Sequence, residues 1–349
     1  MNYVGLDIHA RNFTISVLSK DNMTIFETEL PTSADNLRSV IGAIAEPKCV
    51  VLEESTVAAW AYRTILPCAA QVIVADPVTN AWISKDENIN DAEAARKLAQ
   101  LLRAGYINPV HHNTQHNQFF KELVQLYHDT STEMTPFKNK LKAKFRQHGV
   151  NCTGTQVYSD KGRQRWLQQL EDADAHYQIQ FLLETIDHLQ AQKSRLRREL
   201  AKRAKAFEPI RRFRDVPGIG LIRAATFFAI IDTPHRFANK RKLWSYCGLG
   251  IAKQTSDQMS GPQHLTRRGN PMLKAVAKGA AVTAIGSRDN RFALQYKALI
   301  GNDVGPESAR LTGARAIVST LWAIWRKGEE YMPEKRSVAG FDSQTKHGG

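Results

Sequence analysis

Residues 3–8 read Y-V-G-L-D-I, an alternating apolar stretch that carries one acidic residue, Asp7, almost at the start of the chain. An aspartate at the end of an apolar strand is costly unless it is paired or bound to a metal ion. Similar patterns, with β-branched and aromatic residues in alternation, recur between short polar breaks. The strands that they predict span residues 2–9, 12–18 and 23–30. Three short strands in succession predict a meander.

After the meander, helical and extended patterns alternate along the chain. The predicted elements are a helix at 33–45, a strand at 49–52, a helix at 56–66 and a strand at 72–74. A meander followed by alternating helices and strands predicts a mixed sheet with helices on its faces. This order is that of the α/β ribonuclease-H-like fold, which we expect for the N-terminal part of the chain.

The charge balance favours a polyanionic partner. The 349 residues include 48 Lys and Arg against 34 Asp and Glu, a formal net charge of +14. Such an excess attracts nucleic acid, because each phosphate contact releases counterions. The alternative is a generally basic soluble protein. The length suits two or three domains.

Cysteine spacing and hydropathy argue against other classes of protein. The four cysteines are far apart and form no C-x-x-C pair, which disfavours a zinc or redox site. No basic start precedes a long apolar stretch, and no window approaches 18 uncharged apolar residues. We therefore expect a soluble cytoplasmic protein, associated with the nucleoid and with no membrane partner.

Two further acidic residues accompany Asp7. Glu54 follows the strand at 49–52, which the ribonuclease-H topology places beside the first strand, so both carboxylates can reach one divalent ion. Asp91 opens a helix, on the face formed by positions 88, 91, 95, 98 and 102. This face should pack on the sheet, which directs Asp91 toward the other acids. Its alternative role is to cap the helix, although Ala94 completes no capping box. Because Mg²⁺ prefers carboxylates and water, we expect one or two Mg²⁺ ions that promote phosphoryl transfer.

A repeating apolar pattern marks residues 160–206. Its 3,4 spacing predicts a coiled coil or long helical hairpin, with Lys193 at the one polar seam position. The seam consists of Ile179, Leu182, Ile186, Leu189, Leu196 and Leu200. The partner helix belongs either to a second chain or to the same chain. The C-terminal end is basic, so Arg197 and Arg198 either contact nucleic acid, as we expect, or form only a solvated face.

The remainder of the chain favours a mainly helical unit. The predicted helices are at 219–231, 271–286 and 308–327, and residues 329–349 should form a disordered tail. The stretch D-V-P-G-I-G at 215–220 resembles a helix-hairpin-helix turn, in which Gly218 and Gly220 let backbone amides approach a phosphate. A plain turn between packed helices is the other interpretation.

A polar stretch further on contains Ser256, followed by Thr266-Arg267-Arg268-Gly269-Asn270. A serine in such a stretch is a weak nucleophile unless a base, a metal ion or a phosphate-positioning group activates it. From composition alone Ser256 is an ordinary loop serine. Arg267 and Arg268 are candidates for contact with nucleic acid.

The order of several motifs resembles the insertion-sequence-110 family of transposases, which are related to the Piv DNA invertases. The motifs are V-G-L-D-I, E-S-T, N-D-A-E-A, V-P-G-I-G, R-F-A-N-K-R-K-L-W-S-Y-C-G-L-G and T-R-R-G-N. The resemblance covers roughly residues 2–125 and 207–327. It implies a RuvC-like domain with an Asp-Glu-Asp-Asp set, a helical coiled-coil insert, and a mainly α transposase domain with a catalytic serine. The corresponding ranges are 1–150, 155–206 and 207–328.

The resemblance also implies roles for individual residues. Asp7, Glu54 and Asp91 match the first, second and last acids, and Ser256 matches a serine that attacks DNA and forms a covalent phosphoserine link. It further implies Mg²⁺, double-stranded DNA and a guide RNA encoded by the element. Two positions depart from the family pattern. Asn88 stands for the first aspartate of D-x-x-D, and its amide oxygen can still ligate a metal but brings no charge. Val57 stands for the usual glycine after E-S-T.

The leading hypothesis is therefore a transposase that acts as a homodimer or homotetramer. A nuclease that resolves Holliday junctions is a close alternative, and it would not need Ser256. A catalytically weakened nucleic-acid-binding relative is a second alternative, which Asn88 suggests. An actin-like or sugar-kinase ATPase is disfavoured, because no second glycine-rich phosphate loop is present in the sequence.

Overall fold

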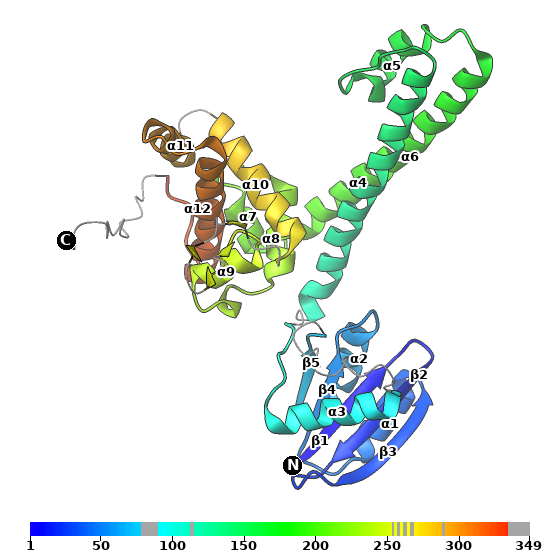
Figure 1. Cartoon of the computed structure of the whole chain (residues 1–349), viewed down its shortest axis with the longest axis vertical. Coiled ribbons are helices and arrows are strands. Elements are labelled where there is room, and N and C mark those ends of the chain that lie inside the picture. The colour runs from blue at the N-terminus through cyan, green and yellow to red at the C-terminus, as the bar shows by residue number, and fades with distance from the viewer. Residues whose placement is uncertain are drawn as a thin grey trace, which may run out of the picture. The chain divides into compact units, whose positions relative to one another are not determined.

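The chain forms two compact units, Met1–Gln115 and His116–Gly349, which are described separately (Figure 1). The computed structural model describes residues 1–77, 90–111, 115–252, 255–256, 259–260, 264–265, 269–287 and 290–333. The division falls before residue 150, the end of the first domain expected from the sequence. Most of the tail predicted at 329–349 lies outside the described residues.

A five-stranded mixed sheet forms the centre of the first unit, in the order β3-β2-β1-β4-β5. The strands are β1 (Asn2–Ile8), β2 (Asn12–Leu18), β3 (Thr24–Pro31), β4 (Lys48–Glu53) and β5 (Gln71–Ala75). The first three pair antiparallel as a meander, and β4 and β5 run parallel to β1. The predicted meander and mixed sheet are confirmed, including the adjacency of the strands that precede Glu54 and carry Asp7.

Helices cover both faces of this sheet. They are α1 (Ala34–Ala43), α2 (Ala58–Ile65) and α3 (Asp91–Ala104), with a short 3-10 helix at Leu66–Cys68. Successive residues of a strand point to opposite faces. Val50 and Leu52 accordingly pack with α1 and α2, whereas Val51 packs with Leu98 of α3. The face that carries α3 is the one on which the candidate site lies.

Helix α3 lies unusually close to β1 because Gly5 has no side chain. A Cβ atom at Gly5 would stand 1.9 Å from the carbonyl oxygen of Ala95. The helix is also tied to the meander by Arg96, whose guanidinium donates two hydrogen bonds of 2.8 Å to the Glu27 carboxylate. These bonds, followed by the one from the Ser16 hydroxyl, outweigh the effect of burial and lower the pKa of Glu27. The start of α3 is therefore held in place over the sheet.

In its described residues, the second unit is helical apart from four two-residue strands. Its helices are α4 (Gln115–Gln147), α5 (Asp160–Leu167), α6 (Ala173–Ala204), α7 (Glu208–Phe213), α8 (Leu221–Ile231), α9 (Lys240–Tyr246), α10 (Pro271–Gly286), α11 (Arg291–Gly301) and α12 (Pro306–Lys327), with 3-10 turns at Gln156–Tyr158 and Pro234–Arg236. The predicted helices at 219–231, 271–286 and 308–327 correspond to α8, α10 and α12. None of the helices in the described ranges is both long enough and apolar enough to cross a membrane.

Helices α4 and α6 lie side by side as a long hairpin (Figure 1). The seam predicted within 160–206 thus has a partner helix in the same chain, one of the two arrangements that the pattern allows. The seam lysine, Lys193, places its Nζ 5.3 Å from the centre of the Tyr127 ring on α4. Burial lowers the pKa of Lys193, and the charge of Lys138 lowers it further.

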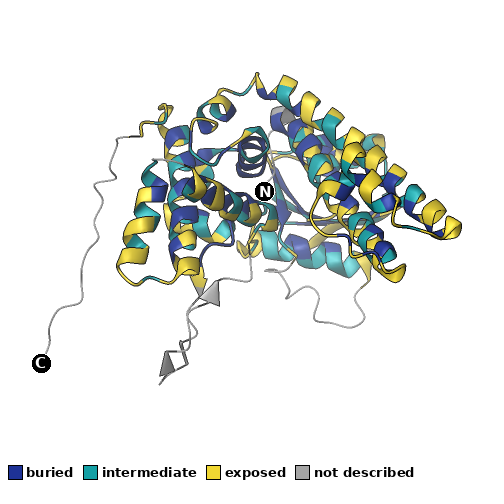
Figure 2. Cartoon of the chain, turned by 90° about the horizontal axis from the view of Figure 1, so that it is seen from above, coloured by how far each residue is buried: buried dark blue, intermediate teal, exposed yellow. Residues whose placement is uncertain are grey.

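The two ends of this hairpin belong to different hydrophobic cores. At the end near α5, Phe145 of α4 packs with Leu183 of α6, and Arg163 of α5 forms a bidentate ion pair with Asp187. At the other end, Phe120 of α4 and Leu200 of α6 join the larger core formed with α7, α8, α10 and α12. Figure 2 shows these helices with buried residues along one side and exposed residues along the other.

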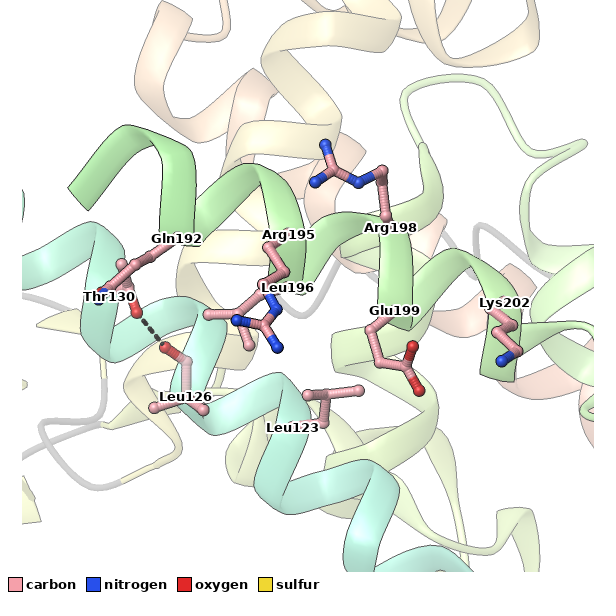
Figure 3. Close-up of a pocket in the computed structure, with 9 residues that line it drawn as sticks. All are labelled: Leu123, Leu126, Thr130, Gln192, Arg195, Leu196, Arg198, Glu199 and Lys202. Carbon is pink, nitrogen blue, oxygen red and sulfur yellow. Dashed lines mark hydrogen bonds between the residues drawn. The ribbon is translucent and has the colours of Figure 1, made fainter. Parts of the chain in front are cut away.

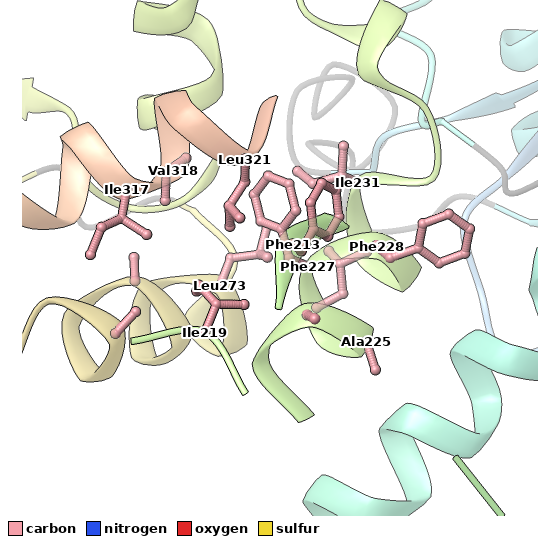
Figure 4. Packing of buried hydrophobic residues seen from close by; sticks show 14 of the residues in the cluster. Phe213, Ile219, Ala225, Phe227, Phe228, Ile231, Leu273, Ile317, Val318 and Leu321 are labelled. Atoms are coloured by element: carbon pink, nitrogen blue, oxygen red, sulfur yellow. The ribbon is translucent and has the colours of Figure 1, made fainter. Parts of the chain in front are cut away.

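Aromatic rings and aliphatic side chains fill the larger core (Figure 4). Phe213 of α7 and Phe227 of α8 meet edge to face, with ring centres 5.4 Å apart. Leu321 of α12 and Leu273 of α10 are fully buried beside them. This core holds the region that contains both the V-P-G-I-G and the C-G-L-G motifs.

A histidine connects α4 to α8 inside this unit. The buried Thr226 hydroxyl donates to the carbonyl of Ile222 at 2.7 Å, so its oxygen accepts a hydrogen bond from His128 Nε2 at 2.8 Å. Burial lowers the pKa of His128; the carboxylate of Asp129 opposes this effect, and the charge of Lys193 adds to it. The contact between α4 and α8 therefore favours the neutral form of the His128 ring.

Acidification should destabilise the α4–α8 contact. The folded pKa of His128 lies below that of an unfolded histidine, about 6.5, so the unfolded chain takes up the proton first as the pH falls. The stabilisation by the neutral His128 ring is therefore fully present above about pH 6.5. It is lost as the pH falls from there through the folded pKa. The free energy of unfolding, measured with urea, should decrease more between pH 7.5 and pH 5.5 for wild type than for His128→Gln. Equal decreases would mean that His128 does not contribute to the pH dependence.

Candidate metal centre

Asp7 and Asp91 converge where β1 meets the start of α3. Gly5 faces α3, and residue 7 of the same strand points to the same side of the sheet. Asp91 is the first residue of α3. Together with His9, these residues offer ligand atoms that all lie within 4.8 Å of one another. Asp7 is mostly buried, whereas His9 and Asp91 are exposed.

Asn90, and not Asp91, caps helix α3. The Asn90 side chain accepts a hydrogen bond of 2.8 Å from the backbone N–H of Glu93. The alternative role of Asp91 as the capping residue is therefore wrong. The Asp91 carboxylate is therefore not the N-cap group of α3, and it lies beside Asp7.

The electrostatics of this corner favour an added cation. Burial raises the pKa of Asp7, and the nearby Asp91 carboxylate raises it further, while His9 opposes both effects. The His9 Nε2 atom lies 3.5 Å from Asp7 Oδ1. Two carboxylates at close range in a partly buried place repel each other unless a positive charge lies between them.

The second acidic position has two candidates, Glu54 and its neighbour Glu53. Glu54 is exposed and follows the last residue of β4, and its side chain is not in the group formed by Asp7, His9 and Asp91. Glu53, which shares the α3-facing side of β4 with Val51, is half-buried. Its pKa is raised by burial first and by the charge of Asp7 second.

Strand alternation could have pointed to Glu53. Val51 lies on the same face as Leu98 of α3, so the residue two positions later is the one that turns toward Asp7. The expectation for Glu54 rests on the E-S-T motif, which this residue begins. Asn88, the fourth candidate ligand, lies outside the described residues.

These residues fit a divalent cation. Carboxylates are the ligands that Mg²⁺ prefers, at about 2.1 Å, so two ligands of one ion lie at most about 4.2 Å apart. The observed limit of 4.8 Å among Asp7, His9 and Asp91 differs from this by less than 1 Å, which a side-chain rotation can close. The exposed positions of His9 and Asp91 leave room for that movement.

The V-P-G-I-G turn packs tightly against α10. Gly218 has φ +85°, and a Cβ atom there would lie 2.2 Å from the carbonyl oxygen of Ala280. Arg223 donates from Nη1 to the Gly218 carbonyl at 2.6 Å and to the Thr283 hydroxyl at 2.9 Å. Gly220 is the N-cap of α8, and open space surrounds the position of its missing side chain. Packing alone thus accounts for Gly218, whereas Gly220 leaves the helix N-terminus open.

Ser256 lies in a small β structure, whereas its polar sequence predicted a loop. Strand β7 (Thr255–Ser256) pairs antiparallel with β8 (Met259–Ser260), so that Ser256 is opposite Met259. Strand β6 (Ile251–Ala252) pairs antiparallel with β9 (His264–Leu265), and β7 and β8 lie between these two strands in the chain. Arg267 and Arg268 lie outside the described residues.

The segment that leads into this β structure is anchored to α12. The Arg315 guanidinium donates to the carbonyl of Leu249 at 2.9 Å and 2.6 Å. Trp244 donates from its indole nitrogen to the Ser319 hydroxyl at 2.9 Å. The C-G-L-G motif therefore leaves the helical core at a fixed position.

A groove of about 730 Å³ lies between α4 and α6, with an apolar floor and a basic rim (Figure 3). Leu123 of α4 and Leu196 of α6 line it from opposite helices. Its basic residues are Arg195, Arg198 and Lys202. Arg197 is also exposed on α6 but does not line the groove.

Comparison with known protein families shows the family to which the chain belongs. Residues 4–149 match the DEDD model described as "Transposase", and residues 210–297 match the model described as "Transposase IS116/IS110/IS902 family". The chain belongs to the insertion-sequence-110 family of transposases. This transposase is thus an enzyme of DNA transposition that acts on insertion-sequence DNA, and its DEDD domain indicates the use of a divalent metal ion.

Two relatives extend along most of the transposase. It is 22% identical over 296 residues to "Transposase for insertion sequence element IS1111A" of Coxiella burnetii, covering 81% of this chain and 79% of that protein. It is 21% identical over 359 residues to "Putative transposase y4qE" of Sinorhizobium fredii, covering 94% and 89%. The similarity therefore extends beyond the two family-model ranges.

Proposed function

We propose that this transposase cuts and rejoins insertion-sequence DNA by metal-assisted phosphoryl transfer, with Ser256 as the nucleophile. The observation that carries the proposal is the convergence of Asp7 and Asp91 at one corner of the DEDD domain. The sheet order, with β4 and β5 parallel to β1, supports a ribonuclease-H-like, RuvC-like fold for residues 1–150. The family-model match at 4–149 supports that range.

Asp7 and Asp91 would hold Mg²⁺, together with a glutamate from the end of β4 and Asn88. The resemblance assigns the glutamate as Glu54, and the shared strand face favours Glu53. When bound, one or two Mg²⁺ ions supply positive charge that stabilises the oxygens of the reacting phosphate. The task of this chain is to keep the carboxylates together, and the ion pair between Arg96 and Glu27 serves it by fixing α3 on the sheet.

Ser256 would form a covalent link with DNA. Its Oγ atom bonds to a backbone phosphorus, one P–O bond to a deoxyribose breaks, and the serine proton ends on the departing oxygen. Attack by a second DNA end on the phosphoserine reverses these changes and rejoins the backbone. No net hydrolysis occurs, so the phosphodiester energy is retained for joining.

Basic residues and glycines outside the acidic centre would position nucleic acid. We assign phosphate contacts to Arg197 and Arg198 of α6, which are exposed, and to Arg267 and Arg268. Gly220 would leave the N-terminus of α8 open to a phosphate, and Gly218 would hold the turn that precedes it. A guide RNA encoded by the element would select the DNA, and two or four copies of the chain would bring two duplexes together. Residues 155–206 would form the helical insert, and 207–328 the transposase domain.

Ser256→Ala should reduce recombination between plasmids that carry the element's ends and its flanking sequence by about a thousandfold, because no other group forms the covalent link. Ser260→Ala, in the paired strand β8, is the matched control and should recombine normally. Trapped protein–DNA adducts should be found in wild type and in the control but not in Ser256→Ala. Normal strand exchange by Ser256→Ala would exclude the serine mechanism.

The same assay separates the alternatives. A Holliday-junction nuclease would cleave branched DNA in the Ser256→Ala variant and leave no adduct in any variant. A catalytically weakened relative would bind DNA without recombining it, and Asn88→Asp would give no gain. Recombination by wild type, increased by Asn88→Asp, would support an active but attenuated metal site.

A further inference from the structure

We infer that His9 is a ligand of the metal site, and that the site therefore prefers a transition-metal dication with affinity for imidazole over Mg²⁺. This inference rests on the proposed function, because it concerns the ion that Asp7 and Asp91 would hold. It adds a nitrogen ligand to a set that the sequence resemblance describes as acidic and amide residues only.

The geometry places His9 with the two carboxylates. Its Nε2 atom is 3.5 Å from Asp7 Oδ1, within the range of an ion pair and also compatible with two ligands of one ion. The ligand atoms of His9 and Asp91 lie within 4.8 Å of each other as well. The ring therefore approaches both acids at once, which an ion pair with Asp7 alone does not require.

The backbone explains why the histidine reaches this position. Residues 7 and 9 are two apart, so both point to the α3-facing side as β1 ends at Ile8. His9 is held there by its own N–H, which donates to the Asn12 carbonyl at 3.0 Å. Its carbonyl accepts from the Thr32 hydroxyl at 2.9 Å. The main chain of His9 is thus fixed, while its exposed ring can rotate toward an ion.

The chemistry of the ligands decides the preferred ion. Mg²⁺ favours oxygen ligands and keeps several waters, whereas imidazole suits later transition metals, whose affinity rises along the first row. Asn88, which stands where the family pattern has an aspartate, would bring no charge. An imidazole nitrogen offers the site a strong neutral ligand that favours Co²⁺ over Mg²⁺.

Calorimetric titration of the full-length protein with Co²⁺ and with Mg²⁺ tests this inference. His9→Ala should weaken Co²⁺ binding about tenfold or more, because loss of even an outer-shell partner of a metal ligand costs about 10–100-fold in affinity, and change Mg²⁺ binding by less than about threefold. His176→Ala, an exposed histidine on α6, is the matched control and should bind both ions as wild type does. Thermal unfolding of each variant without metal verifies that it is folded.

Pulsed electron paramagnetic resonance with Mn²⁺ gives a readout that needs no activity. Wild type and His176→Ala should display a ¹⁴N coupling from a bound imidazole, and His9→Ala and His9→Gln should not. Co²⁺ binding that weakens in Asp7→Asn but not in His9→Ala, with the ¹⁴N coupling unchanged, would overturn the role of His9 and leave the proposed metal site intact. Unchanged Co²⁺ binding in both variants would overturn the metal site itself.

Discussion

Replacing Asp7 by Asn should reduce transposition by about a thousandfold or more. Asp7 is the most buried member of the group with His9 and Asp91, so its carboxylate is the least replaceable by water. Loss of metal-stabilised charge in phosphoryl transfer costs several kcal/mol, and each 1.4 kcal/mol is about tenfold in rate. Transposition frequency from a plasmid-borne element is the measurement.

This loss should not be a folding defect. Since burial is the main cause that raises the pKa of Asp7, the neutral amide of Asp7→Asn should leave the metal-free protein at least as stable as wild type. The control is Asp35→Asn, an exposed acid in the first turn of α1, which should transpose within about threefold of wild type. Normal transposition by a folded Asp7→Asn protein would contradict a catalytic role for this residue.

Replacing Gly5 by Val should destabilise the first unit by about 3 kcal/mol or more, the upper part of the range for overpacked cores. The added Cβ atom would stand 1.9 Å from the Ala95 carbonyl oxygen and 2.7 Å from the Ala99 nitrogen. Both are backbone atoms of α3, so the helix must move away from β1. Urea unfolding followed by circular dichroism measures the effect.

The same substitution should weaken metal binding, because the displaced helix carries Asp91. Gly42→Ala is the matched control: nothing lies within 4 Å of the missing side chain, and alanine is the better residue inside a helix such as α1. It should be neutral or slightly stabilising. A Gly5→Val protein of wild-type stability would mean that α3 does not depend on this close approach.

Local pattern predicted the first unit well because each strand is short and its alternation is clear. The strand that contains Asp7 and the helix that begins at Asp91 were both found, and the family motifs directed attention to the acids. The sequence pattern failed where a residue's role depends on contacts with residues far away in the chain. The choice between Glu53 and Glu54 depends on which face of β4 meets α3. The cap of α3 is Asn90, whereas the sequence offered Asp91 as the alternative capping residue.

Other features had no signal in the sequence taken alone. His9 gains a role only through the position of α3 across the sheet, far away in the chain. Helix α4 was not predicted, and its pairing with α6 follows from contacts such as Lys193 with Tyr127. For Ser256, the family resemblance is the only reason to expect a catalytic role, since a serine in a polar stretch is common.

The two separate cores of the α4–α6 hairpin have a consequence for how the protein opens. Phe145 and Leu183 hold one end, and Phe120 and Leu200 hold the other, with the half-buried Lys193 between them. A segment whose contacts are mostly its own can unfold without the remainder. Amide hydrogens at the α5 end should therefore exchange in a cooperative event of their own, at lower free energy than those of the larger core.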